Sequence, residues 1–206
     1  MVQSLRGVSL ILILLLALGV LPARAATPTE EVKQVIDEVL AVLSDPDLGS
    51  PGQRKQRRRL IKQAIDRRFD YGEMARRSLA QHWRALSPAQ REEFVRLFSE
   101  LLERSYGDKF EAYAGGETVT YLSERRDGDH AEVRTVLVRP NDKIPMNYSL
   151  YYNSGQWMIY DVVIEGVSLV SNYRSQFQTI IRQSSYEGLV SRLRARLEEL
   201  RKIDKL

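Results

Sequence analysis

Four segments with the pattern of β-strands follow one another between residues 117 and 165, and only a few residues separate each from the next. The separating sequences, Asp127-Gly128, 140–142 and 153–155, are rich in the residues that favour turns. Because neighbouring parallel strands need a long crossover, such short connections restrict the four strands to an antiparallel meander. We expect the strands at about 117–125, 130–139, 144–152 and 156–165.

The alternation of side chains along a strand indicates which faces of the sheet are buried. In the third predicted strand, Ile144, Tyr148 and Leu150 share one face, whereas Asn147 and Ser149 lie on the other. The fourth predicted strand is apolar on both faces. We therefore expect a sheet with one covered face and one wetter face, and a fourth strand that is central or covered twice.

Helical patterns flank the strands on both sides. Apolar residues recur at helical spacing over 32–43 with Thr29 as the expected N-cap, and further helices are expected over about 54–68 and from Asp70 to Trp83. Ser87-Pro88 begins a long helix that is rich in aromatic residues. The pattern predicts an α+β fold in one domain over residues 26–206, with a helical part over 28–114, strands over 117–165 and a helical tail over 168–203.

The first 25 residues have the three parts of a secretion signal. Arg6 precedes an apolar run from Val8 to Leu21, and Ala23-Arg24-Ala25 supplies small residues where a signal peptidase cuts. The apolar run is shorter than the roughly 20 residues that span a bilayer. We expect cleavage after Ala25. Because the chain has no cysteine and so no disulfide framework, the periplasm is the expected destination.

The residues that usually carry catalysis or metal binding are scarce. The chain has no cysteine and two histidines, and it lacks the recognised nucleophile, zinc-protease, phosphate-loop and dinucleotide motifs. Loss of Arg6 and Arg24 with the signal lowers the formal net charge from +4 to +2. We therefore expect no enzyme activity, no metal, no cofactor and no nucleic-acid partner.

Three alternatives remain open from the pattern alone. One is an enzyme with Asp161 as a general acid or base, and another is a binding protein for small hydrophobic molecules. The third is an interaction module that uses its charged C-terminal helix. The basic runs over 54–59 and 192–196 are hypotheses for docking surfaces. A sheet covered by helices either packs solid or encloses a cavity, and the pattern favours neither.

Several ordered stretches of the chain resemble one known family. They are 69–74, 79–83, 87–94 and the long stretch 157–177, which reads WMIYDVVIEGVSLVSNYRSQF. In these stretches the sequence is similar to the MlaC family of periplasmic phospholipid-binding proteins, also called the toluene-tolerance or ABC-transporter auxiliary family. The resemblance covers nearly the whole chain after residue 25.

The resemblance implies a fold similar to the NTF2-like arrangement, with an apolar cavity and phospholipid as cargo. It implies a monomeric carrier between an outer-membrane lipoprotein–porin complex and an inner-membrane ABC transporter with an MCE domain, which maintains outer-membrane lipid asymmetry. Arg174 is a hypothesis for a contact with the lipid phosphate. The predicted lipid-binding residues are Phe69, Tyr71, Met74, Phe94, Phe98, Leu101, Leu102 and Tyr106 on the helical side, Tyr148, Leu150, Val162 and Val163 on the sheet, and Leu169, Tyr173 and Phe177 on the helix that follows.

Overall fold

The computed structural model describes residues 26–111 and 116–203, with side chains over 26–107 and 116–203. The predicted signal peptide, residues 1–25, lies outside the described residues, and its cleavage after Ala25 stays a prediction. Among the described helices, none is both long enough and apolar enough to cross a bilayer. The elements in chain order are α1 (Pro28–Ser44), η1 (Pro46–Leu48), η2 (Pro51–Gln53), α2 (Arg54–Asp66), α3 (Tyr71–Leu79), η3 (Ala80–Ala85), α4 (Pro88–Glu111), β1 (Thr118–Asp127), β2 (His130–Arg139), β3 (Asp142–Asn153), β4 (Gln156–Ile164), β5 (Val167–Ser168), α5 (Leu169–Ser184) and α6 (Tyr186–Ile203).

The strands form one antiparallel sheet in the order β1-β2-β3-β4-β5, which confirms the predicted α+β class and the meander. The predicted number of four strands is wrong. Glu165 and Gly166 have φ values of 50° and 82° and reverse the chain, so that Val167 and Ser168 pair with Ile164 and Val163. A strand of two residues is too short to show alternation, and the sequence pattern therefore missed it.

The first helix begins two residues earlier than predicted, because its N-cap is Thr27 and not Thr29. Thr27 is the N-cap: its hydroxyl accepts a hydrogen bond from the Glu30 amide, and the Glu30 carboxylate accepts one from the Thr27 amide. Pro28 then fills the first helical position, where its missing N–H costs nothing. The predicted cap, Thr29, instead donates from its amide and hydroxyl to the Glu124 carboxylate on β1.

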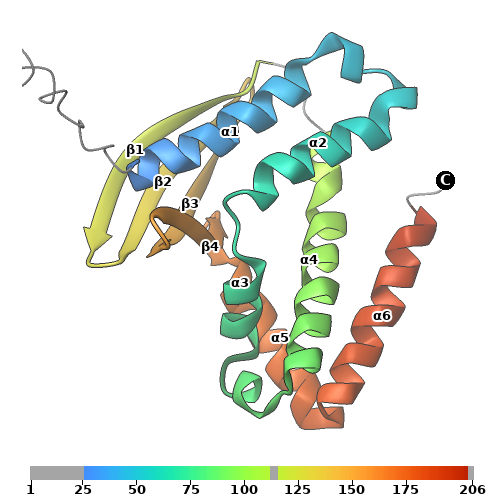
Figure 1. Cartoon of the computed structure of the whole chain (residues 1–206). Coiled ribbons are helices and arrows are strands. Elements are labelled where there is room, and N and C mark those ends of the chain that lie inside the picture. Colours follow the sequence, from blue (N-terminus) through green and yellow to red (C-terminus); the bar gives the residue numbers. More distant parts are fainter. Residues whose placement is uncertain (1–25, 112–115, 204–206) are drawn as a thin grey trace, which may run out of the picture.

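The molecule has two parts that differ in construction (Figure 1). We call the sheet together with α1 and α2 the sheet half, and α3 to α6 the helical half. In Figure 1, α1 lies across the sheet, α2 runs beside α1, and the four later helices gather into a bundle. The core of the helical half is one large cluster of buried apolar side chains, whereas the sheet half has two smaller clusters, one on the sheet and one between α1 and α2.

Hydrogen bonds at the junction fix the two halves relative to each other. The Asp70 amide donates to the Ile159 carbonyl (2.9 Å), and the Ile159 amide donates to the Arg68 carbonyl (2.7 Å). Asp70 also caps α3 by accepting from the Glu73 amide, and its carboxylate accepts from the Tyr151 hydroxyl. The chain therefore enters the helical half from a position that is held against β4.

Candidate functional site

A cavity of about 900 Å³ lies between the sheet, α1, α2 and the C-terminal part of α4. Its size is in the upper part of the range for pockets that bind small organic ligands. Most of its walls are aliphatic or aromatic side chains, and half of the charged side chains among its described lining residues come from α2. The site is therefore an apolar chamber with a polar side, and its chemistry follows from which elements supply which wall.

Helix α1 supplies one apolar wall. Its lining residues recur at three- and four-residue intervals, so they share one face of the helix. Val32 and Val39 are buried in this face, whereas Ile36, Leu40 and Leu43 are half-buried because they border open space. An amphipathic helix normally buries such a face against a packed core, but here part of it borders a cavity.

The sheet supplies the opposite wall. On β3, Ile144, Met146 and Tyr148 alternate with polar residues, as predicted, and all three line the cavity. Ile159 and Val162 of β4 continue this surface. The other lining residues of the sheet are Val119, Leu137, Arg139 and Ile164, so all of the first four strands contribute.

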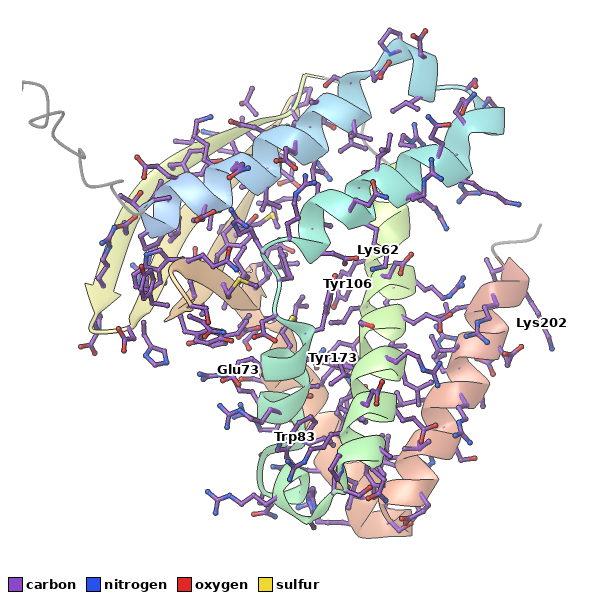
Figure 2. The ribbon with its side chains drawn as sticks, in the orientation of Figure 1. Lys62, Glu73, Trp83, Tyr106, Tyr173 and Lys202 are labelled. Atoms are coloured by element: carbon purple, nitrogen blue, oxygen red, sulfur yellow. The ribbon has the colours of Figure 1, made fainter. Side chains whose placement is uncertain are left out.

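The helical half closes one end of the chamber. Met74 of α3 and Leu102 and Tyr106 of α4 line it, together with Phe69 and Tyr71 at the junction. Figure 2 shows the Tyr106 side chain between α4 and the sheet half, below Lys62 of α2. The end of α4 therefore belongs to both parts, since its earlier turns pack inside the helical half.

Eight of the fifteen predicted lipid-binding residues line this cavity. They are Phe69, Tyr71, Met74, Leu102, Tyr106, Tyr148, Val162 and Leu169. Their proximity in three dimensions is a fact of the fold, and their contact with lipid stays a prediction.

The other seven predicted residues do not line the cavity. Phe94, Phe98, Leu101, Tyr173 and Phe177 are buried in the core of the helical half, and Leu150 is buried in the core of the sheet. Val163 is half-buried on β4. The aromatic residues pack against one another instead: the Phe98 ring lies 5.2 Å from the Tyr173 ring and 5.5 Å from the Phe177 ring, both edge-to-face. Such pairs favour a solid core.

The sequence analysis missed most of the walls of the chamber. The apolar face of α1 carried a usable signal, because its helical periodicity was evident over 32–43. Ile61 and Ile65 of α2 and the basic residues on the same helix also line the cavity. The basic run was interpreted as a docking surface, and nothing in its spacing indicated that one side of it borders an apolar chamber.

Burial raises the pKa of three acidic groups in the walls of the chamber. Burial raises the pKa of the Tyr148 phenol above its ordinary range, and burial followed by the nearby Asp66 carboxylate raises the pKa of Tyr71. Burial also raises the pKa of the Glu103 carboxyl, although Lys62 and Arg104 oppose the shift. The two phenols are therefore neutral at physiological pH, which suits a chamber for an apolar ligand.

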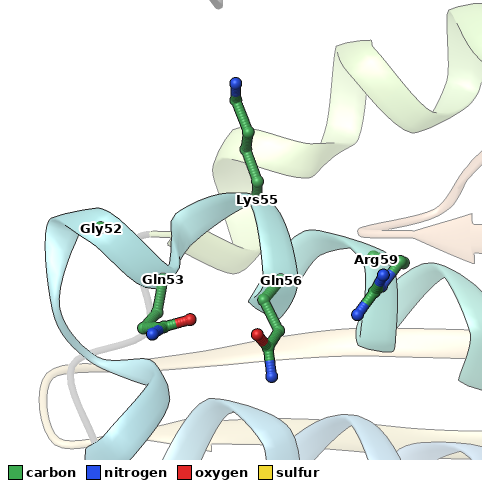
Figure 3. Close-up of a pocket in the computed structure, with 5 residues that line it drawn as sticks. All are labelled: Gly52, Gln53, Lys55, Gln56 and Arg59. Carbon is green, nitrogen blue, oxygen red and sulfur yellow. The ribbon is translucent and has the colours of Figure 1, made fainter.

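A second, polar pocket of about 340 Å³ adjoins the chamber at the start of α2. Gly52, Gln53, Lys55, Gln56 and Arg59 line it (Figure 3). In this view the side chains of Gln53, Gln56 and Arg59 point to one side of α2, and Lys55 extends to the other. Lys55 and Arg59 line both cavities, so the polar pocket and the apolar chamber are neighbours on α2.

The residues considered for catalysis and phosphate binding lie elsewhere. Asp161 is 8% exposed and does not line the chamber. Its carboxylate accepts hydrogen bonds from the Val170 amide (3.0 Å) and the Ser168 hydroxyl at the start of α5, which is a structural role. Arg174 donates from Nε to the Arg77 carbonyl (2.9 Å), away from the chamber lining. Within residues 26–111 and 116–203, no group of three or more histidine or carboxylate side chains is arranged to hold a metal ion.

The fold and the chamber have counterparts among known proteins. A phospholipid-binding protein from Ralstonia solanacearum, solved in complex with a phospholipid, superposes with a TM-score of 0.75 and 28% sequence identity over 85% of this chain and 99% of that one. The intermembrane phospholipid transport system binding protein MlaC of Haemophilus influenzae is 26% identical over 123 residues. That match spans 56% of this chain and 56% of the relative, so it covers only about half the length of either protein.

The sequence profile of the family described as MlaC protein matches residues 33–195, which include α1, α2 and the whole sheet as well as the helical half up to most of α6. Every wall of the chamber described above is contained within this match, apart from Val32 at its N-terminal border. The chain therefore belongs to the MlaC family.

Proposed function

We propose that this protein is a phospholipid carrier that holds the acyl tails of one lipid in the chamber between the sheet, α1, α2 and α4. The observation that carries the proposal is the chamber itself, about 900 Å³ in volume and lined mostly by aliphatic and aromatic side chains. Its fold is similar to that of the phospholipid-binding protein from Ralstonia solanacearum that was solved in complex with a phospholipid. The predictions from the sequence extend this proposal to a periplasmic monomer that moves lipid between the outer-membrane and inner-membrane complexes and so maintains lipid asymmetry.

The energetics of lipid transfer support a carrier that does no covalent chemistry. A diacyl lipid has on the order of 30 methylene groups, and each contributes about 0.8 kcal/mol to the free energy of leaving water. Transfer through water without a carrier therefore faces a barrier of up to about 24 kcal/mol. A protein that replaces this burial with its own apolar walls removes most of the barrier, and it needs no catalytic residue to do so.

The test is to extract the protein after purification from a bacterial host and to identify the extract by mass spectrometry. We expect about one phospholipid per protein. The variant Met146→Trp narrows the chamber from the sheet wall, and it should reduce the recovered lipid severalfold. Val163→Trp is the matched control, since Val163 is half-buried on the neighbouring strand and does not line the chamber.

Three results would contradict the proposal. They are recovery of no phospholipid from the wild-type protein, recovery of only small hydrophobic molecules, and equal loss of lipid in Met146→Trp and Val163→Trp. Circular dichroism of each variant shows whether a loss of lipid accompanies a loss of folded structure. A folded Met146→Trp variant that carries the full amount of lipid would also count against the chamber as the binding site.

A further inference from the structure

The charged residues that line the chamber are predominantly basic. Of the side chains that the structure describes, seven lysines and arginines line it, against the three carboxylates of Glu103, Glu117 and Glu165. Five of the seven lie on α2, at positions 54, 55, 58, 59 and 62, which fall on one side of the helix. The ligand that fits such a chamber is apolar over most of its length and negatively charged at one end.

Two of these basic side chains have no carboxylate partner among the side chains that the structure describes. Among the residues that the structure describes, no ion pair involves Lys55 or Arg59, and both are exposed, whereas Lys62 is paired with Asp66. Lys55 and Arg59 are also the two residues shared by the apolar chamber and the polar pocket. A charged group at the boundary between the two cavities would therefore lie beside Arg59 on the side of the glutamines, whereas the Lys55 side chain extends to the other side of α2 (Figure 3).

A third basic side chain is incompletely satisfied on the sheet side of the chamber. Arg139, the last residue of β2, lines the chamber, and its Nε atom is buried without a hydrogen-bond partner in the described part of the chain. A buried donor without a partner costs about 1–3 kcal/mol, so such a group is normally satisfied by water, an ion or a ligand. A phosphate oxygen is a suitable acceptor for a guanidinium N–H.

The polar pocket also has groups that suit an uncharged, hydroxyl-bearing substituent. Gln53 and Gln56 each offer an amide donor and an amide acceptor, and Figure 3 shows both on the same side of α2 as Arg59. Among the side chains that the structure describes, no carboxylate lines this pocket. A quaternary ammonium group would therefore meet a cation without a compensating negative charge, whereas a glycerol hydroxyl would meet the two amides.

We infer that the polar pocket, together with the basic residues Lys55, Arg59 and Arg139 that line the chamber, forms a binding site for the head group, with a preference for phospholipids of net negative charge over zwitterionic ones. This inference rests on the proposed function. It specifies the class of cargo: a phosphodiester with an uncharged, hydroxyl-bearing head, such as phosphatidylglycerol. The phosphate lies at the boundary of the two cavities, the head in the polar pocket and the tails in the chamber.

The experiment offers the purified protein equal amounts of phosphatidylglycerol and phosphatidylcholine with the same acyl chains, mixed in one kind of vesicle. After exchange the protein is separated from the vesicles, and its lipid is identified by native mass spectrometry. We expect roughly fivefold enrichment of phosphatidylglycerol, which is the effect of one or two solvent-exposed charge pairs. The preference should weaken at high salt, because salt screens exposed charges.

Variants of Arg59 test whether the preference for phosphatidylglycerol over phosphatidylcholine depends on the basic residues of α2. Arg59→Glu should bring the two lipids close to equal recovery, while Arg59→Lys should keep most of the preference because it keeps the charge. Arg192→Glu is the matched control, since Arg192 is exposed on α6, has no ion pair among the described residues and does not line either cavity. It makes the same change in net charge and should leave the enrichment unchanged.

The outcomes separate this inference from the proposed function. If the wild-type protein acquires neither lipid, the carrier function itself fails. If it acquires both lipids equally, the carrier function stands and the inference is overturned. Equal loss of preference in Arg59→Glu and Arg192→Glu would also overturn it, because the effect would then depend on net charge alone.

Two further measurements distinguish a bound phospholipid head group from free phosphate and from a membrane surface. Binding of inorganic phosphate alone is measured by calorimetry, and binding to phosphatidylglycerol vesicles by sedimentation. Binding of inorganic phosphate that Arg59→Glu abolishes, without any preference between the two lipids, would overturn the head-group site. Adhesion to anionic vesicles without transfer of lipid to the protein would overturn it as well.

Discussion

The two halves of this protein use similar apolar side chains in opposite ways. In the helical half, the rings of Phe94, Phe98 and Phe177 lie within 6 Å of one another and exclude space. In the sheet half, part of the aliphatic face of α1 borders a chamber of about 900 Å³ instead of packing against another element. Apolar content alone therefore does not identify a binding cavity. The arrangement of the elements that carry it decides whether a surface packs or stays open.

The largest expected effect is on the packed half. Phe98→Ala removes a completely buried ring that contacts three other aromatic residues, and it should lower the free energy of unfolding by about 3–5 kcal/mol. Urea denaturation measures this change. A loss below about 1 kcal/mol would mean that the helical half is also loosely packed, and the comparison between the halves would fail.

The next effect concerns the connection between the halves. Asp161→Asn removes the charge that accepts hydrogen bonds from Val170 and Ser168 at the start of α5, and it should cost about 2 kcal/mol. Trp157 lies in the sheet half and Trp83 in the helical half. Variants with one tryptophan each therefore report the unfolding of each half by fluorescence. If Asp161 couples the halves, their two unfolding transitions should separate in Asp161→Asn and coincide when Asp161 is present.

Alkaline pH tests whether the chamber shields its phenols from water. Burial raises the pKa of Tyr148 in the folded protein, so above about pH 10 the unfolded state loses its proton first. The free energy of unfolding is therefore unaffected by this tyrosine below about pH 10. Above that pH it falls by about 1.4 kcal/mol per pH unit for each such tyrosine. Tyr148→Phe should reduce this slope, as measured by urea denaturation between about pH 8 and pH 11. An unchanged slope would indicate that water reaches the phenol.

The smallest effect is expected on the wall of the chamber. Leu40 already borders open space, so Leu40→Ala should cost about 1 kcal/mol or less, compared with about 2–5 kcal/mol for a leucine in a packed core. Leu101→Ala in the helical half is the matched comparison, since Leu101 is buried in that core. If the two variants lose equal stability by urea denaturation, α1 packs as tightly as α4.

Much of the fold could be predicted from local patterns, because those patterns are strong. The turns at Asp127-Gly128 and 153–155 fix an antiparallel order, and Ser87-Pro88 gives the start of α4. The errors occur where two local solutions compete. Thr27 and Thr29 are both suitable caps, and the reciprocal bonds with Glu30 decide in favour of Thr27. The two-residue strand β5 depends on pairing with β4, which no local pattern reports.

The candidate site was less predictable. The sequence determined which residues are apolar and which face of each helix and strand they occupy. It did not determine whether that apolar face packs against another element or borders a cavity. Phe98 and Ile36 lie on equally clear apolar stripes, yet one is fully buried and the other borders the chamber.

The geometry of the junction between the two halves determines which apolar faces pack together and which border the chamber. Backbone hydrogen bonds between the segment 68–70 and Ile159 set where α3 begins, and hence how far the end of α4 lies from α1 and the sheet. The spacing between elements is a property of these long-range contacts. The chain alone therefore determined an amphipathic α+β protein with a basic run at 54–59. Only the fold decided that this basic run borders an apolar chamber.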